Sequence, residues 1–142
     1  MITAVDTGVL LDILGADPRF GRSSAEALRT CIAGGGVIAC EVVWAETSAS
    51  FAEAIAAEEA LAKLRVDFSP IGATESIAAG EAWREYRQAG GTRERVIADF
   101  IIGAHAMARA DRLLTRDRGF YSRYFEGLTI FDPTAENTIP MT

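Results

Sequence analysis

Short runs of apolar residues alternate along the chain with longer segments in which apolar residues recur at helical spacing. The short runs predict strands over residues 1–5, 37–40, 66–71, 113–115 and 128–131. The longer segments predict helices over residues 8–14, 25–33, 41–51, 53–64, 74–89 and 95–110, with a further helical turn within 117–125. Ser23 and Ser24 suit the N-cap of the second helix, and Pro70 favours an edge position for the third strand.

The order of these elements indicates the fold class. Strands alternating with helices predict an α/β protein, with a mostly parallel central sheet of about five short strands flanked by helices on both faces, an α/β/α sandwich. The length of 142 residues suits a single domain over 1–142. No window offers about 18 uninterrupted apolar residues, so we expect no membrane span. The start, MITAVDTGVL, lacks a signal peptide's basic segment, and we expect a cytoplasmic protein.

One carboxylate, Asp99, lies within the strongly apolar helix predicted over 95–110. Its neighbours there include Val96, Ile97 and Phe100. An ionised carboxylate that is buried without a partner is costly, so Asp99 needs a cation, hydrogen-bond donors or a metal ion. The alternative is that the helix begins later than predicted and Asp99 caps it.

Two further acids follow predicted strands, at the edge of the sheet where ligand sites form. Asp6 ends the first strand, and Asp117 follows the fourth. In open α/β sheets, ligands bind outside the carboxyl ends of the strands, so both acids can point into one crevice. Taken alone, Asp6 could simply cap the first helix, and Asp117 could be an ordinary loop acid.

Glu46 is the fourth candidate, in the helix after the second strand. Helical spacing groups it with Val42 and Val43 and with Ala49 and Ser50, which predicts that it faces the packed side. It could instead pair with an Arg from residues 84–123. A cluster of like-charged carboxylates repels itself and makes sense mainly around a cation. An all-oxygen ligand set without His or Cys suits Mg²⁺, with Mn²⁺ possible.

Charge is distributed unevenly along the chain. The total is −6, but residues 84–123 hold 9 Arg against 5 acids. The acidic total argues against generic nucleic-acid binding, whereas the Arg-rich segment is compatible with a short positive groove. Four arginines flank two of the acids and are candidates for phosphate contacts: Arg93, Arg95, Arg116 and Arg118. The alternative, which stays open, is that these arginines pair with the protein's own carboxylates.

The remaining reactive side chains suggest no second site. We expect Cys31 and Cys40 to be buried thiols rather than a disulfide or a metal pair. The lone histidine, His105, is six residues after Asp99 and therefore about 120° away round the helix. We expect it to be a core or interface residue and not a general base.

Several stretches together resemble PIN-domain ribonucleases, specifically VapC-like toxins of bacterial type II toxin–antitoxin pairs. They are ITAVDTGVLLDIL, VVWAETSASF, RERVIADFIIGAHAMARADRLLTRDRGFYSRYF and the closing LTIFDP. The four acids of the family fall on Asp6, Glu46, Asp99 and Asp117. Gly119 stands near the position where many relatives carry a further acid or Asn, which bears on any second metal site.

The resemblance implies a PIN-like fold and a metal-dependent endoribonuclease that is the toxin of a toxin–antitoxin pair. Asp6 and Asp99 would be the main metal ligands, and Glu46 and Asp117 would complete the shell directly or through water. Thr7, Thr115, Arg95 and Arg116 would contact the RNA substrate. The implied partners are a cognate antitoxin and a second copy of the chain, with DNA reached only through the antitoxin.

Two alternatives stay open within this resemblance. The chain could be a catalytically weak module that acts mainly as the partner of a DNA-binding antitoxin, or an RNA-processing nuclease outside any such pair. Other phosphate-handling folds fit poorly. A receiver domain needs a Lys after its last strand, but the only lysine is Lys63, and a haloacid-dehalogenase-like phosphatase needs an Asp where Gly8 stands. No GxxxxGK[ST] or GxGxxG motif is present.

Overall fold

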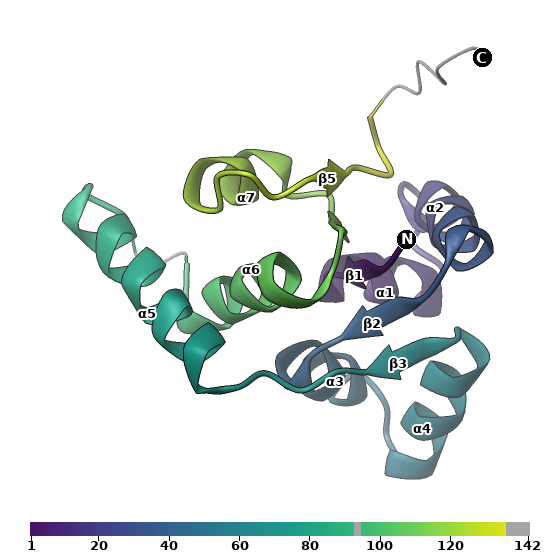
Figure 1. Cartoon of the computed structure of the whole chain (residues 1–142). Coiled ribbons are helices and arrows are strands. Elements are labelled where there is room, and N and C mark those ends of the chain that lie inside the picture. Colours follow the sequence, from purple (N-terminus) through teal and green to yellow (C-terminus); the bar gives the residue numbers. More distant parts are fainter. Residues whose placement is uncertain (93–94, 136–142) are drawn as a thin grey trace.

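Five parallel strands form the centre of the molecule (Figure 1). The computed structural model describes residues 1–92 and 95–135. The strands are β1 (Thr3–Val5), β2 (Val37–Ala39), β3 (Val66–Phe68), β4 (Arg112–Leu114) and β5 (Ile130–Phe131). Their order across the sheet is β3-β2-β1-β4-β5, and every pair is parallel. The predicted α/β fold is confirmed, and β3 lies at an edge, as Pro70 indicated.

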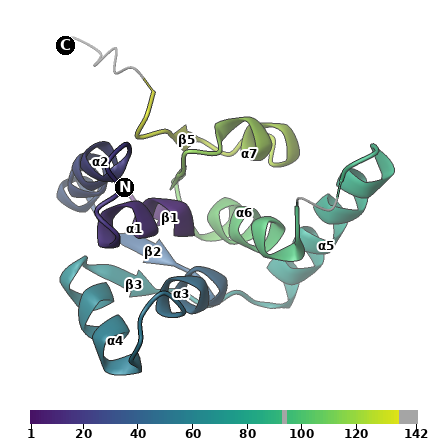
Figure 2. The same ribbon diagram turned by 180° about the vertical axis from the view of Figure 1, so that it is seen from behind.

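Seven helices in the described residues connect and cover the strands, in the predicted order of elements. They are α1 (Thr7–Leu14), α2 (Gly21–Gly34), α3 (Glu41–Ser48), α4 (Ala54–Lys63), α5 (Ala73–Gln88), α6 (Ile97–Arg109) and α7 (Arg118–Tyr124). Figures 1 and 2 show α5 and α4 at opposite sides of the molecule, with the sheet between them. None of the helices in the described residues is long and apolar enough to cross a membrane.

The start of α2 differs from the prediction. The helix begins at Gly21, and Phe20 rather than a serine occupies the N-cap position. The carboxylate of Asp17 accepts hydrogen bonds from the backbone N–H groups of Arg19 and Phe20, both at 2.8 Å, and so fixes the turn into the helix. Ser24 is instead fully buried in the helix, where its hydroxyl donates to Asp12.

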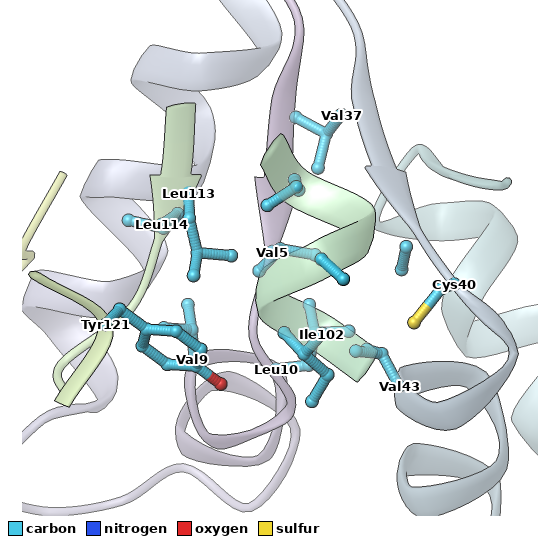
Figure 3. Close-up of a cluster of buried hydrophobic side chains, with 14 of the residues drawn as sticks. Val5, Val9, Leu10, Val37, Cys40, Val43, Ile102, Leu113, Leu114 and Tyr121 are labelled. Atoms are coloured by element: carbon cyan, nitrogen blue, oxygen red, sulfur yellow. The ribbon is translucent and has the colours of Figure 1, made fainter. Parts of the chain in front are cut away.

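The apolar core lies where α6 packs against β1 and β4 (Figure 3). Val5, Leu113 and Leu114 are at most 1% exposed, and Phe100 and Ile102 of α6 belong to the same cluster. α6 begins at Ile97, later than predicted, with Val96 at its N-cap. Asp99 therefore lies in the first turn, where the helix dipole favours a negative charge. Val96 rather than Asp99 is the N-cap residue, although the Asp99 carboxylate interacts with the Val96 backbone from the first turn.

Strand order places a ligand crevice between β1 and β4. From β1 the chain moves through β2 to β3 on one side of the sheet, then returns to add β4 and β5 on the other. Neighbouring connections that leave a sheet in opposite directions open a crevice at the carboxyl ends of the two central strands. Asp6 comes directly after β1, and Thr115 directly after β4, at this position.

Candidate active site

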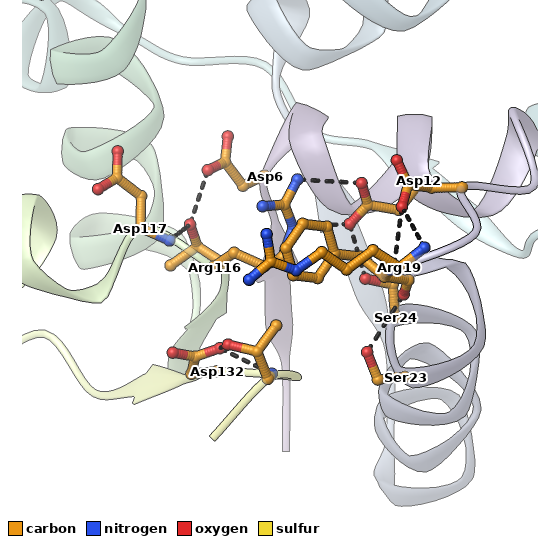
Figure 4. A network of polar contacts seen from close by, with 12 residues as sticks. Asp6, Asp12, Arg19, Ser23, Ser24, Arg116, Asp117 and Asp132 are labelled. Carbon is orange, nitrogen blue, oxygen red and sulfur yellow. Dashed lines mark hydrogen bonds and ion pairs between the residues drawn. The ribbon is translucent and has the colours of Figure 1, made fainter. Parts of the chain in front are cut away.

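Thr115 joins the two acids that follow the central strands. Its hydroxyl donates to Asp6 Oδ2 at 2.7 Å, and the same oxygen accepts the backbone N–H of Asp117 at 3.0 Å. The backbone N–H of Asp6 donates to the carbonyl of Leu114 at 3.0 Å, which continues the β1–β4 pairing up to the site. Asp6 occupies the N-cap position of α1 but makes no side-chain cap bond, so its carboxylate is available to the crevice (Figure 4).

Arg95 connects Asp117 to Asp99. Its guanidinium donates to Asp117 Oδ2, and Nη1 also lies 4.0 Å from Asp99 Oδ2. The guanidinium carbon stacks over the Phe120 ring, 4.2 Å from the ring centroid, which holds the side chain against α7. The alternative that the arginines pair with the protein's own acids therefore holds for Arg95, although its N–H groups remain beside the crevice.

The carboxylates of the crevice interact electrostatically. Burial is the main cause that raises the pKa of Asp6 to about 6; the charges of Asp99 and Asp117 contribute to the rise, and hydrogen bonds from Thr115 and the Thr7 backbone oppose it. Burial also raises the pKa of Asp99, with Asp117 and Glu46 adding to the rise and Arg95 opposing it. All four predicted acids are thus brought close enough to interact, and they carry more negative charge than Arg95 neutralises.

Glu46 reaches the crevice from an exposed position, which corrects the prediction that it faces the packed side. The buried residues of α3 are Val43 and Thr47, and the helix ends at Ser48, so the expected stripe does not form. Thr7 nevertheless donates its hydroxyl to Glu46 Oε1 at 2.7 Å and holds the carboxylate toward α1. Among the described residues Glu46 forms no ion pair with an arginine.

Tyr121 was not predicted from the sequence. It is 1% exposed, and within the described part of the chain its hydroxyl has no hydrogen-bond partner. Burial raises its pKa well above the ordinary value, and the charges of Asp6, Asp99 and Asp117 contribute. A buried hydroxyl needs a partner, so this group beside three acids marks a place for a water or a ligand. Its position four residues after Asp117 was the available sequence signal.

Arg116 lies at the other side of the crevice. A cleft of about 360 Å³ is lined by Asp6, Gly8, Val9, Arg116 and Asp117. Arg116 pairs with Asp12, an acid of α1 that the sequence did not single out. Of the other two candidate arginines, Arg118 is exposed, and Arg93 lies outside the described residues.

The remaining sequence predictions concern groups outside the crevice. Cys31 and Cys40 are free, buried thiols, as predicted. His105 is 1% exposed, and its Nε2 lies 3.0 Å from the Ser69 hydroxyl, which confirms a core histidine. Gly119 is exposed, and a Cβ there would meet no atom within 4 Å.

A divalent metal suits the donor chemistry of the crevice. Among residues 1–92 and 95–135, no group of three or more His, Cys, Asp and Glu side chains stands arranged to hold an ion. The Arg95 guanidinium is the counter-cation of Asp117 in this arrangement. The acids nevertheless offer only oxygen, burial and the neighbouring acids raise the pKa of Asp6 and Asp99, and the Tyr121 hydroxyl lacks a partner among the described residues. These are the properties of a site for a hard cation such as Mg²⁺.

Fold and site together define a class of α/β proteins with an acidic crevice at the switch point of a parallel sheet. The sequence matches the PIN domain over residues 3–126. The chain belongs to the PIN-domain family, whose members are nucleases. None of the curated protein sequences matches the chain significantly.

Solved structures of similar fold include proteins of toxin–antitoxin systems. VapBC2 from Rickettsia felis, bound to a DNA fragment from its promoter, has a TM-score of 0.73 and 19% identity, covering 93% of this chain and 98% of that one. VapBC-1 from nontypeable Haemophilus influenzae has a TM-score of 0.71 and 17% identity, covering 94% and 99%. VapC20 from Mycobacterium tuberculosis, a toxin that cleaves the sarcin–ricin loop, has a TM-score of 0.56 and 16% identity, covering 78% and 86%.

Proposed function

We propose that the protein is a metal-dependent endoribonuclease, the toxin of a toxin–antitoxin pair, acting as a single nuclease domain. The observation that carries the proposal is the surplus of carboxylate at the β1–β4 switch point. Asp6, Asp99 and Asp117 share this crevice, and Glu46 is held at its rim by Thr7. A folded protein keeps such a self-repelling group of acids where it serves a bound cation.

Each acid has a role that its surroundings support. Asp6 and Asp99 would hold a Mg²⁺ or Mn²⁺ ion, with Glu46 and Asp117 completing the shell directly or through water. When bound, the ion would activate water for in-line attack and neutralise charge on the phosphate. Thr115 orients the Asp6 carboxylate through its 2.7 Å hydrogen bond, and Thr7 does the same for Glu46.

Two arginines near the acids, Arg95 and Arg116, would bind the RNA backbone. Arg95 stands between Asp99 and Asp117, and Arg116 lines the cleft beside Asp6. Guanidinium groups offer N–H donors in a planar fork that matches phosphate oxygens. The net charge of −6 leaves little general attraction for RNA, so these local contacts would carry the binding.

The proposed partners are a cognate antitoxin and a second copy of the chain. Support comes from the similar solved structures, which include VapBC complexes, one of them bound to promoter DNA. DNA would then be reached only through the antitoxin.

A chelator experiment tests the proposed activity. Purified protein, free of any antitoxin, is incubated with total RNA in Mg²⁺ and in excess EDTA, and the cleavage sites are mapped. We expect cleavage in Mg²⁺ only, with none by Asp6→Asn protein under either condition. Equal cleavage in EDTA would contradict the metal mechanism. If intact protein cleaves no RNA but still binds an antitoxin, the catalytically weak alternative replaces the proposal. Cleavage confined to maturation sites would favour an RNA-processing nuclease.

A further inference from the structure

Asp12 is a buried acid that the proposed reaction does not use directly. It lies in the second half of α1 and is 5% exposed. Its Oδ2 accepts the Ser24 hydroxyl of α2 at 2.9 Å and the Nε–H of Arg116 at 2.8 Å. Its Oδ1 accepts an N–H of Arg116 Nη2 at 3.0 Å. Asp12 thus holds Arg116 at two points, from an element 104 residues earlier in the chain.

The flat face of the Arg116 guanidinium also stacks on an aromatic ring. Its central carbon lies 3.9 Å from the centroid of the Phe20 ring. Phe20 is held in turn, because its backbone N–H donates to Asp17 Oδ1 at 2.8 Å. A two-point ion pair combined with stacking leaves the guanidinium few alternative orientations.

The unused N–H groups of Arg116 lie beside the acidic cleft. A guanidinium has five N–H donors, and the pair with Asp12 uses one on Nε and one on Nη2. The other donors, on Nη1 and Nη2, have no partner among the described residues. A Cβ added to Gly8, which lines the cleft, would lie 3.9 Å from Nη2. In Figure 4, Asp6 and Asp117 lie on one side of Arg116, and Asp12 and Ser24 on the other.

We propose that Asp12 is a positioning residue that orients Arg116 to bind a phosphate of the RNA next to the one that is cleaved. The inference rests on the proposed function, since it requires RNA in the cleft. Asp12 offsets the charge of Arg116, so the pair adds little long-range attraction and contributes a fixed set of donors instead. Binding of RNA, rather than the chemical step, should therefore depend on Asp12.

The Glu75–Arg109 pair is a matched control. It too joins a buried acid to the Nε and Nη2 of an arginine, and it ties α5 to α6. Neither residue lines the acidic cleft. Replacing Glu75 therefore measures how the loss of such a pair affects the fold, while the proposed contact between Arg116 and a phosphate stays unchanged.

The experiment is a double-mutant cycle on RNA cleavage, with KM and kcat measured separately. Asp12→Asn should raise KM about threefold to tenfold and Arg116→Met about tenfold or more, each with kcat within about twofold. In the Arg116→Met background, Asp12→Asn should have no further effect on KM, because it acts through Arg116. Glu75→Gln should leave KM unchanged. The double variant carries no unpaired buried charge, so comparing it with Asp12→Asn still measures the effect of Arg116 on KM if the Arg116→Met single variant folds poorly.

Binding of a labelled single-stranded RNA in EDTA gives a second readout, in which Kd should rise in parallel with KM. Additive effects of the two substitutions on KM, or an unchanged KM in folded Asp12→Asn protein, would overturn the positioning role and leave a structural ion pair. If the intact protein neither cleaves nor binds RNA, the proposed function fails. If it does both while the variants match it, only this inference fails.

Discussion

The acidic crevice and the α5–α6 junction both contain carboxylates that are at least partly buried, but they balance the charge differently. At the junction, Glu75 accepts from Nε and Nη2 of Arg109, and this hydrogen bonding is the main cause that lowers the pKa of Glu75. In the crevice, burial raises the pKa of Asp6 to about 6 and also raises that of Asp99. The ionised acid is favoured in the first region and disfavoured in the second.

This difference separates a structural pair from a site held ready for a ligand. Glu75 is satisfied by Arg109 and by the backbone N–H of Gly72, at 3.1 Å, so its charge supports the fold. Among the described residues, the only ion pair that either Asp6 or Asp99 forms is the one between Asp99 and Arg95, at 4.0 Å. Functional sites are where proteins tolerate such unfavourable charge. Replacing an acid in each region should therefore have opposite consequences for stability and activity.

The largest expected effect is the loss of cleavage in Asp6→Asn and Asp99→Asn proteins. Substitutions that only orient a metal ligand already cost about 10–100-fold, so removing a ligand should reduce kcat by at least about a hundredfold. Each substitution also removes a repelling charge, so the metal-free variants should unfold at the same temperature as wild type or a higher one. The measurements are RNA cleavage rates and thermal unfolding followed by circular dichroism. Normal cleavage by either variant would contradict the assignment.

Glu75→Gln should show the reverse pattern. The substitution leaves Arg109 without its carboxylate and weakens the contact between α5 and α6. We expect the unfolding temperature to fall by about a few degrees, with kcat and KM for RNA unchanged after correction for the folded fraction. If Glu75→Gln protein lost activity without losing stability, the distinction between a structural pair and a functional crevice would be wrong.

The pH dependence of stability sharpens the comparison. The pKa of Asp6 rises from 3.8 to about 6 in the folded protein, so its contribution to stability is full below pH 3.8 and is lost as pH rises through about 6. In EDTA, this loss should reach up to about 3 kcal/mol. Urea unfolding at pH 4.5 and pH 7.5 measures the part of the loss that falls between these two values, about 2 kcal/mol, with Asp6→Asn as the control. A stability difference between the two proteins that is the same at both pH values would contradict the prediction.

The smallest expected effect on the fold belongs to Tyr121→Phe. The Tyr121 hydroxyl bonds to no group in the described part of the chain, so its removal breaks no hydrogen bond there. Stability should change by less than about 1 kcal/mol, as measured by urea unfolding. Thr115→Val is the comparison, because it removes the hydrogen bonds to Asp6 and Asp117 and should lower kcat. A large loss of stability in Tyr121→Phe would reveal a partner for the hydroxyl.

Most of the fold was predictable because local patterns determine it. The spacing of apolar residues alone predicts the order of strands and helices. The rule that ligands bind at the carboxyl ends of parallel strands predicts that Asp6 and Asp117 belong to the site. Glu46 shows the limit. Its place in the crevice depends on the hydroxyl of Thr7, 39 residues earlier, whereas helical spacing alone predicted that it would be buried.

The partners of the arginines could not be predicted for the same reason. Arg95 bonds an acid 22 residues later, and Arg116 bonds Asp12 across 104 residues. Such pairs depend on how α1, α2 and the segment after β4 pack together, and no local sequence pattern predicts that packing. Ser24 illustrates the consequence, because a residue with good capping chemistry was used instead to hold Asp12 inside the fold.

A calorimetric titration of Mn²⁺ into metal-free protein tests most directly whether the surplus carboxylates of the crevice serve a cation. Wild-type and Glu75→Gln proteins should bind the ion with equal affinity, and Asp99→Asn should bind it at least about tenfold more weakly. Equal binding by wild-type and Asp99→Asn proteins, or no binding by either, would contradict the account.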